Sequence, residues 1–466
     1  MTPRSSTGPA PGLILFITTV SAFCTSFAAS SVNVALPLIG NEFHLGGVAL
    51  NWVVTAFVLT SAVLIMPLGR LGDLYGRQRI FSWGMGVYLV GSLAGALAPD
   101  AFWLTASRAF TGVGAAMAFG TVTAVLVAAY PPQERGRVLG INVAMVYLGL
   151  SVGPVLGGLV VEAWGWRSLL LTHAGLSLLV VILVFVGLRE NDKESHHEGF
   201  DFVGSLLYAL GLAAVVVGVS TLPGTLAIVL ILAGLAVLVG FWFYESRAKS
   251  PILAVTHFTR NRVFAFSNLA AMVSYSGTFS VVFFLSLYLQ VVRGLSPAWA
   301  GTLLIVQPLV QAIFSPLTGR LSDRVSPRLL ASTGMGLTAL GLAGLSLADA
   351  TIPLGWVIGD LILLGLGFAL FSSPNTNAIM GSVEKRDLGL ASATVATMRV
   401  IGQMASMALA LVLLSLILGS AQVTTQTADL FLVAQRWGFG FSAVLCGLGI
   451  FASLARGSGR RIDQGA

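Results

Sequence analysis

Long apolar runs alternate with short polar segments along the whole chain. A helix that crosses a membrane needs about 20 mostly apolar residues, and fourteen runs reach that length. We predict one transmembrane helix in each of these runs: 13–37, 49–69, 79–98, 101–130, 137–161, 168–188, 203–222, 224–245, 263–292, 298–318, 329–348, 354–378, 388–418 and 435–456. The pattern therefore predicts an all-α polytopic membrane protein.

Composition strengthens this prediction. The chain has 466 residues, of which 56% are hydrophobic and 9% are charged. Soluble domains carry roughly 25% charged residues, so a soluble protein is excluded. Cys24 and Cys446 both lie in apolar runs near opposite ends of the chain, and we expect no disulfide.

The basic residues predict the orientation in the membrane. With a cytoplasmic N-terminus, twenty of the 25 Lys and Arg residues fall on the cytoplasmic side. Arg167, Arg293 and Arg436 then lie outside, and Arg108 and Arg399 lie within spans. We expect both termini in the cytoplasm. The net charge of +7 follows from this positive-inside bias, so we expect no nucleic-acid partner.

The longest polar segment between spans, residues 189–200, contains adjacent histidines. His196 and His197 stand beside Glu194 and Glu198, and such side chains can bind a metal ion. A solvated linker is the better interpretation, because no rigid element fixes ligand geometry. We therefore expect no metal site and no cofactor.

A glycine-rich charged tract, Gly69-Arg-Leu-Gly-Asp73-Leu-Tyr-Gly76-Arg77-Gln-Arg79, joins the second and third spans. Its glycines permit close helix approach, and Asp73 can accept hydrogen bonds at a helix N-terminus. Arg77 can pair with Asp73 or face lipid head groups. A weaker copy, Gly319-Arg-Leu-Ser-Asp323-Arg324, returns downstream. We interpret the tract as a latch for one access state; the alternative is an ordinary positive-inside loop.

A second glycine pattern lies inside the fifth span. Gly149, Gly153 and Gly157 recur every four residues and share one helix face, which permits close packing. Pro154 removes a backbone donor and bends the helix. The same segment contains a Gly-x-Ser-x-Gly pattern, but within a span and without a suitable His/Asp pair. We do not expect an enzyme.

These tracts resemble the major facilitator superfamily, and specifically its fourteen-helix drug:proton antiporter family. Residues 69–79 match its motif A, 108–116 match motif B and 149–158 match motif C, which marks antiporters. The resemblance implies an exporter. Two departures stand out: Ala28 replaces a usual aspartate of helix 1, which puts the coupling ion in doubt, and His173 replaces a usual asparagine.

The resemblance also implies a domain organisation. We expect an N-terminal six-helix bundle over 1–190, two inserted helices with their linkers over 191–250, and a C-terminal six-helix bundle over 251–466. The bundles enclose a midplane cavity and rock against each other. The role of the inserted helices stays open.

Ionisable residues within spans are candidates for function. Arg108 and Asp360 each lie roughly 10 Å from the outer surface, at 1.5 Å per residue, and Arg399 lies near the middle of its span. Asp360 is our leading proton-coupling candidate, although a static carboxylate with a fixed partner is equally compatible. Glu162 and His173 are further candidates, either as coupling groups or as an interfacial and a packing residue.

Apolar spans around the expected cavity suggest a lipophilic cargo. The substrate-cavity candidates are Asn33, Arg108, Met145, Phe279, Phe283, Phe368 and Arg399. Flexible methionine and aromatic surfaces suit variable ligands. We predict proton-coupled drug export of amphipathic or lipophilic compounds. The alternatives are transport of a specific lipophile with weak or different coupling, and a non-transporting membrane scaffold.

The expected surroundings follow from the same reasoning. We expect a monomer in a prokaryotic inner membrane, with a small lipophilic substrate, protons and membrane lipids as its partners.

Overall fold

The computed structural model describes residues 11–45, 47–187, 199–221, 224–248, 250–253, 255–419 and 423–456. Nearly all of these residues are helical, and the described residues contain no strand. The predicted fold class, an all-α polytopic membrane protein, is confirmed. The linker histidines His196 and His197 lie outside the described residues.

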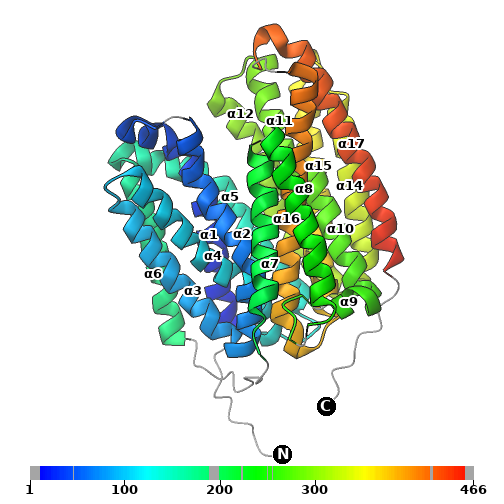
Figure 1. The fold of residues 1–466 in the computed structure, drawn as a ribbon. Coiled ribbons are helices and arrows are strands. Elements are labelled where there is room, and N and C mark those ends of the chain that lie inside the picture. The colour runs from blue at the N-terminus through cyan, green and yellow to red at the C-terminus, as the bar shows by residue number, and fades with distance from the viewer. Residues whose placement is uncertain are drawn as a thin grey trace, which may run out of the picture. The chain divides into compact units, whose positions relative to one another are not determined.

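The chain divides into two compact units. Unit 1 comprises the N-terminal residues up to Phe200 together with Lys385–Ala393, and unit 2 comprises Asp201–Glu384 with the residues from Thr394 onward. Six long helices of unit 1 are labelled in Figure 1: α1 (Pro11–Phe43), α2 (Gly47–Tyr75), α3 (Arg77–Ala96), α4 (Ala101–Ala129), α5 (Arg135–Trp164) and α6 (Trp166–Gly187).

Unit 2 contains the remaining helices, apart from the start of α16. These are α7 (Phe202–Ser220), α8 (Thr225–Glu245), α9 (Val255–Arg260), α10 (Arg262–Thr278), α11 (Val281–Leu287), a π-helix (Tyr288–Val292), α12 (Pro297–Leu304), α13 (Val306–Arg324), α14 (Pro327–Ser346), α15 (Leu354–Met380), α16 (Leu388–Leu418) and α17 (Ala428–Ala455). Short 3-10 helices, Lys385–Asp387 and Thr425–Thr427, precede α16 and α17. The first turn of α16 therefore belongs to unit 1, and the rest of this helix belongs to unit 2.

Thirteen helical segments of the described chain are long and apolar enough to cross a membrane. The one predicted span that is not among these thirteen segments is 79–98. It corresponds to α3, a helix of 20 residues that falls short of this apolar criterion. Its first turn carries Arg77, Gln78 and Arg79, which lowers its apolar character. The remaining predicted spans match these segments to within a few residues at most ends, and the predicted spans 203–222 and 224–245 correspond to two separate helices, α7 and α8.

The predicted spans 263–292 and 298–318 each correspond to one candidate membrane span, but the helix is interrupted within each of them. Within 263–292, the helix breaks at Phe279–Ser280, where the Ser280 N–H donates to Ser406 Oγ at 3.0 Å. Within 298–318, it breaks at Ile305, three residues before Pro308. Proline has no N–H to continue the helical ladder, which explains the second break.

The polar loop expected after residue 69 is also much shorter than predicted. Helix α2 continues to Tyr75, α3 begins at Arg77, and a single residue, Gly76, makes the corner. Gly76 has φ 101°, a conformation that residues with a side chain rarely adopt. The tract is therefore two helix ends around one glycine.

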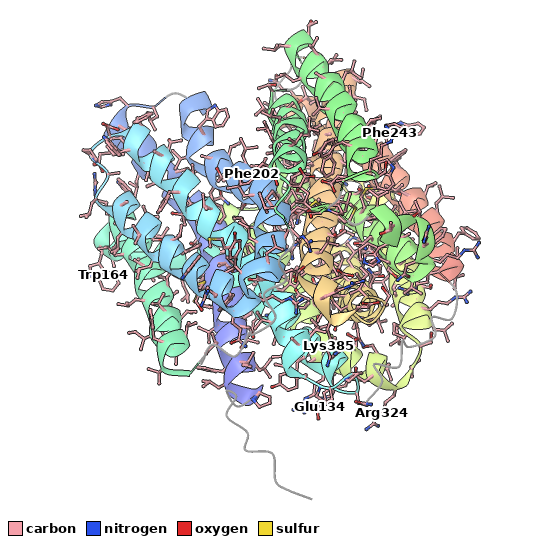
Figure 2. All side chains as sticks on the ribbon, turned by 60° about the horizontal axis from the view of Figure 1, so that its bottom comes forward. Glu134, Trp164, Phe202, Phe243, Arg324 and Lys385 are labelled. Carbon is pink, nitrogen blue, oxygen red and sulfur yellow. The ribbon has the colours of Figure 1, made fainter. Side chains whose placement is uncertain are left out.

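Each unit has its own apolar core. In unit 1, one cluster includes Phe27, Leu104 and Leu169; in unit 2, one includes Phe284 and Phe439. Large apolar side chains also cover the outer faces of the helices, and Figure 2 labels Trp164, Phe202 and Phe243, which are 75%, 76% and 60% exposed. Exposed apolar surface of this extent is typical of helices that face lipid.

Helices α7 and α8, which we predicted as an inserted pair, group with unit 2. The Tyr208 hydroxyl of α7 is 3.2 Å from Thr397 Oγ1 of α16, and both residues are buried. Phe241 of α8 packs on the Tyr208 ring at 5.7 Å. The buried hydrogen bond therefore joins α7 to α16, and the ring contact joins α8 to α7.

Candidate transport site

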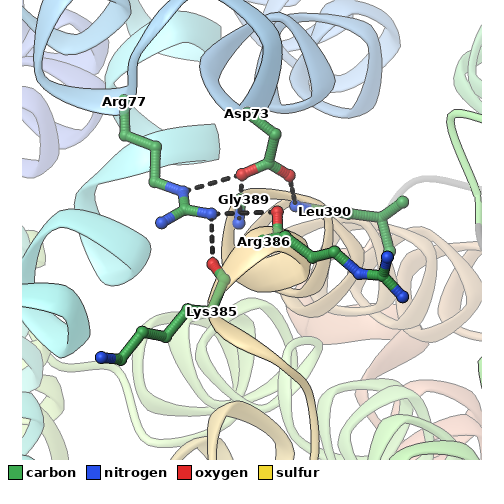
Figure 3. Close-up of polar contacts among 6 residues, drawn as sticks. All are labelled: Asp73, Arg77, Lys385, Arg386, Gly389 and Leu390. Atoms are coloured by element: carbon green, nitrogen blue, oxygen red, sulfur yellow. Dashed lines mark hydrogen bonds and ion pairs between the residues drawn. The ribbon is translucent and has the colours of Figure 1, made fainter. Parts of the chain in front are cut away.

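The carboxylate of Asp73 caps the N-terminus of α16 (Figure 3). Its Oδ1 accepts the Gly389 N–H at 2.9 Å, and its Oδ2 accepts the Leu390 N–H at 2.8 Å. The first N–H groups of a helix have no partner within the helix and carry partial positive charge. The buried carboxylate therefore satisfies two of these donors and interacts favourably with the helix dipole.

Arg77 completes this arrangement from the start of α3. Its Nε donates to Asp73 Oδ1 at 2.7 Å. Its Nη2 donates to the carbonyl oxygens of Lys385 at 2.5 Å and Arg386 at 3.0 Å. Figure 3 shows both side chains directed at the same turn. We call Asp73, Arg77 and the bonded backbone of residues 385–390 the α16 cap.

Glycines allow this close approach. A Cβ at Gly69 would lie 2.5 Å from the Ala393 Cβ, and a Cβ at Gly389 would overlap the Asp73 carboxylate. Any side chain at either position forces the helices apart. The expected pairing of Asp73 with Arg77 and its contact with a helix N-terminus are thus both present.

The downstream copy of the tract has different contacts. Asp323 Oδ1 accepts from Asn377 Nδ2 of α15 at 3.4 Å, a long hydrogen bond between side chains. Arg324, labelled in Figure 2, is exposed at the end of α13. The similar sequences therefore occupy different environments.

Arg108 of α4 is buried inside unit 1, with 3% of its surface exposed. Its Nε donates to the Val53 carbonyl at 3.4 Å, and its guanidinium carbon lies 4.6 Å from the centre of the Phe57 ring. Tyr88 and His173 interact with it electrostatically. We call Arg108, Phe57, Tyr88 and His173 the Arg108 cluster.

His173 of α6 is also buried and faces α1. Its Nε2 is 3.0 Å from Ser31 Oγ, and its ring packs edge-on against Phe27 at 5.6 Å. Ala28 is fully buried against Phe57 and Tyr88. The structure therefore brings together two predicted candidates, Arg108 and His173, and adds Tyr88, which we did not predict because nothing in its sequence context distinguishes it.

The glycines of the fifth span lie against α1. A Cβ at Gly149 would lie 2.6 Å from the Phe23 carbonyl oxygen, and one at Gly157 would lie 2.7 Å from the Ser31 Cβ. At Gly153 a Cβ would overlap Ser30 Oγ. The three glycines thus form one face in close contact with α1, and Pro154 lies within α5.

Asp360 of α15 points at α14. A Cβ at Gly344 would lie 2.5 Å from Asp360 Oδ1, so this carboxylate occupies the space that the glycine leaves. The Trp356 side chain hydrogen-bonds the carboxylate, whereas Oδ2 is buried without a hydrogen-bond partner. Buried polar atoms are normally paired, so this oxygen is a candidate for a proton.

The other predicted residues are dispersed within their own units. Phe368 is buried, and its ring centre lies 5.2 Å from that of Tyr275. Asn33, Glu162 and Phe279 are exposed, and Met145, Phe283 and Arg399 are partly exposed. Within either unit, the described contacts do not gather these residues into one site.

Arg456, at the end of α17, forms a buried network that we did not predict. It donates to Ser267 Oγ at 3.1 Å, to Asn375 Oδ1 at 2.9 Å and to the Pro327 carbonyl at 2.8 Å. Burial, together with the nearby Arg328, lowers its pKa to about 10. The sequence indicates only a basic residue after a span, so its burial could not be foreseen.

The chain matches known membrane proteins over most of its length. The family model described as Major Facilitator Superfamily matches residues 18–407 and 267–461. The Multidrug resistance protein Stp of Mycobacterium tuberculosis is 33% identical over 84% of this chain and 73% of its own. The Cephamycin export protein CmcT of Amycolatopsis lactamdurans is 31% identical over 86% of this chain and 84% of its own. The Riboflavin transporter RibZ of Clostridioides difficile is 28% identical over 83% and 84%.

Solved structures show the same fold at low sequence identity. The human organic anion transporter MFSD10 has a TM-score of 0.71 and 13% identity over 96% of this chain and 100% of its own. The proton:xylose symporter XylE has a TM-score of 0.66 and 14% identity over 95% and 96%.

The helices, the glycine-rich tracts and these matches define a multi-pass membrane transporter. The chain belongs to the major facilitator superfamily. The matched family is one of transporters, and no family of enzymes is indicated. The bacterial relatives of the chain suggest a plasma membrane.

Proposed function

We propose that this protein exports amphipathic or lipophilic compounds in exchange for protons, by alternating access. The observation that carries the proposal is the α16 cap: a buried carboxylate bonded to the first turn of a helix that continues into unit 2. The relatives add to it, since Stp and CmcT are described as a multidrug resistance protein and a cephamycin export protein.

The α16 cap acts as a reversible latch. Hydrogen bonds to charged groups contribute about 1.5–3 kcal/mol each, so the few bonds of Asp73 and Arg77 favour one access state by several kcal/mol at most. Thermal motion and substrate binding overcome a preference of this size. When the bonds break, the first turn of α16 is free to leave unit 1.

Asp360 carries the transported proton. Its unpaired Oδ2 is buried against α14, and a carboxyl group changes its proton affinity when its solvation or neighbouring charges change. A conformational change at α15 therefore makes it bind or release a proton. Glu162 and His173 are weaker candidates: Glu162 is exposed, and His173 lies beside the cation of Arg108.

Transport of one specific lipophile without proton coupling is the second candidate. The observation that favours it is Ala28, which is fully buried in the Arg108 cluster and brings no acid to it. RibZ, which is described as a riboflavin transporter, supports a substrate that is not a drug.

We expect the protein to work as a monomer, with both termini in the cytoplasm. Arg77 and Arg79 then lie on the cytoplasmic side, where anionic lipid head groups gather.

Proteoliposomes test the proposal. The test follows uptake of the cationic dye rhodamine 123 into liposomes with an acidic lumen, with the membrane potential clamped by potassium and valinomycin. We expect a pH gradient to drive uptake by the wild type, and Asp360→Asn to lose the gradient dependence. Uptake that is indifferent to both the gradient and the substitution would overturn proton exchange at Asp360 and favour the second candidate.

A further inference from the structure

We propose that Arg108 binds the acid group of an anionic amphiphile, so that carboxylic acids are the preferred cargo. The inference rests on the proposed export function and narrows its substrate class. It concerns the interior of unit 1 alone.

Arg108 is a buried cation for which the described residues supply no anion. Its partners are one carbonyl oxygen, at the long distance of 3.4 Å, and the face of the Phe57 ring. Among the described residues no carboxylate lies within ion-pair distance of its guanidinium, and no acid appears among the groups that interact with it electrostatically. An isolated charge away from water is costly, and buried charges are normally paired.

Two further polar groups of the Arg108 cluster also have unused hydrogen-bonding capacity. Tyr88 Oη and His173 Nδ1 are buried and have no hydrogen-bond partner in the described chain. If His173 carries its proton on Nδ1, its Nε2 accepts from the Ser31 hydroxyl. The tyrosine hydroxyl and the histidine Nδ1–H are then both free to donate. Donors without acceptors around a cation are the chemistry of an anion site.

A small apolar pocket adjoins Arg108. It is lined by Arg108 and by apolar side chains of α1, α2, α4 and α6, among them Val32, Val53, Leu104 and Leu169. Its free volume of about 10 Å³ holds one water molecule, so the site is closed in this conformation. An acid group enters only when the lining helices separate, and the apolar walls then contact the hydrocarbon part of the cargo.

Ala28 offers an internal probe of the site. Its side chain packs with Phe57 and Tyr88, so Ala28→Asp adds a carboxylate to the Arg108 cluster. That carboxylate would compete with an anionic cargo for Arg108, without removing the arginine.

The test compares two dyes that differ only in the acid group. Rhodamine 110 is a carboxylic acid, and rhodamine 123 is its methyl ester. Their affinities for the purified full-length protein in detergent are measured by fluorescence anisotropy, for the wild type, Arg108→Gln, Arg108→Lys and Ala28→Asp. Arg137→Gln, which removes an exposed positive charge of the same unit, is the control. Elution as a single species from a sizing column establishes that each variant is folded.

We expect the wild type to bind the acid about 10-fold or more tightly than the ester, which corresponds to one charge-assisted interaction. Arg108→Gln and Ala28→Asp abolish this preference, Arg108→Lys retains part of it, and Arg137→Gln leaves it intact. If Arg108→Gln does not fold, the acid preference of Ala28→Asp alone tests the assignment.

Two results would overturn the assignment. One is equal affinity of the wild type for the acid and the ester. If the affinity for both dyes then changes when chloride in the buffer is replaced by gluconate, the site takes a free inorganic anion. The other is an acid preference that survives both Arg108→Gln and Ala28→Asp. Either result leaves export of the ester intact, whereas failure to transport either dye into proteoliposomes contradicts the proposed function itself.

Discussion

The Leu390 N–H donates a 2.8 Å hydrogen bond to the carboxylate of Asp73, although 317 positions separate the two residues. Asp73 ends a helix of the N-terminal half, and Leu390 lies in the first turn of α16. A carboxylate at this place stabilises a helix N-terminus through hydrogen bonds and through the helix dipole. The contact thus consists of a charge on one side and backbone donors on the other.

Replacing the charge tests the latch. Asp73→Asn keeps the shape of the side chain and one acceptor, but it removes the charge that Arg77 and the α16 N-terminus share. We expect a fall in the initial rate of dye uptake of about 10-fold or more, which corresponds to the loss of one charge-assisted bond. Asp323→Asn makes the same change in the downstream copy of the tract and is the matched control, for which we expect a smaller effect. Equal losses in both variants would argue against a special role for Asp73.

The α1–α5 interface depends on its glycines. At Gly153 an added methyl group overlaps Ser30 Oγ and meets the Phe27 carbonyl oxygen at 3.0 Å. We expect Gly153→Ala to lower the free energy of unfolding by about 1–3 kcal/mol, as overpacking does. The measurement is a thermal melt in detergent. Gly158→Ala, on the same helix with 3.7 Å to the nearest atom, is the control. Equal melting temperatures for the two variants would contradict the packing argument.

Arg456 holds α10, α14 and α15 to the end of α17. Removing its guanidinium leaves the Asn375 Oδ1 and the Pro327 carbonyl without this donor, and an unsatisfied buried acceptor costs about 1–3 kcal/mol. We therefore expect Arg456→Ala to lower the melting temperature markedly. Arg324→Ala, which removes an exposed arginine, leaves it nearly unchanged. A melting temperature of Arg456→Ala within error of the wild type would show that the network is dispensable.

The contact of Glu42, near the end of α1, with Trp166 and Arg167, at the start of α6, depends on pH. The Trp166 Nε1–H donates to Glu42 Oε2 at 2.7 Å and Arg167 lies 2.6 Å from Oε1, so these partners hold the pKa of Glu42 below its ordinary value of 4.5. A lowered carboxyl pKa gives stability that is complete above the ordinary pKa and is lost as pH falls through the folded one.

Trp166 reports this transition by its fluorescence. We expect the emission of the wild type to change only below about pH 4.5, and the change to be absent in Glu42→Gln. A transition of the same size in Glu42→Gln would assign it to another group.

The sequence predicted the spans well, because apolar length alone determines them. It also indicated that Asp73 can bind a helix N-terminus and that Arg77 can pair with Asp73 or face lipid head groups, since the tract holds the required charges and glycines. It could not identify the helix, because residues 73 and 389 are related only through the fold. The break at Ser280 was missed for the same reason: its N–H is taken by Ser406 of α16. Likewise, the sequence shows Arg456 only as a basic residue after a span. Three of its hydrogen-bond partners lie on three other helices, which the sequence does not relate to it.

Proton counterflow during substrate uptake is the measurement that distinguishes proton exchange from uncoupled transport. Wild-type proteoliposomes are loaded with the pH-sensitive dye pyranine at an acidic lumen pH, the membrane potential is clamped, and rhodamine 123 is added outside. We expect the lumen to become more alkaline as the substrate enters, at a rate that rises and saturates with substrate concentration, and we expect Asp360→Asn to abolish this response. Substrate uptake by the wild type without any change in lumen pH would contradict proton exchange.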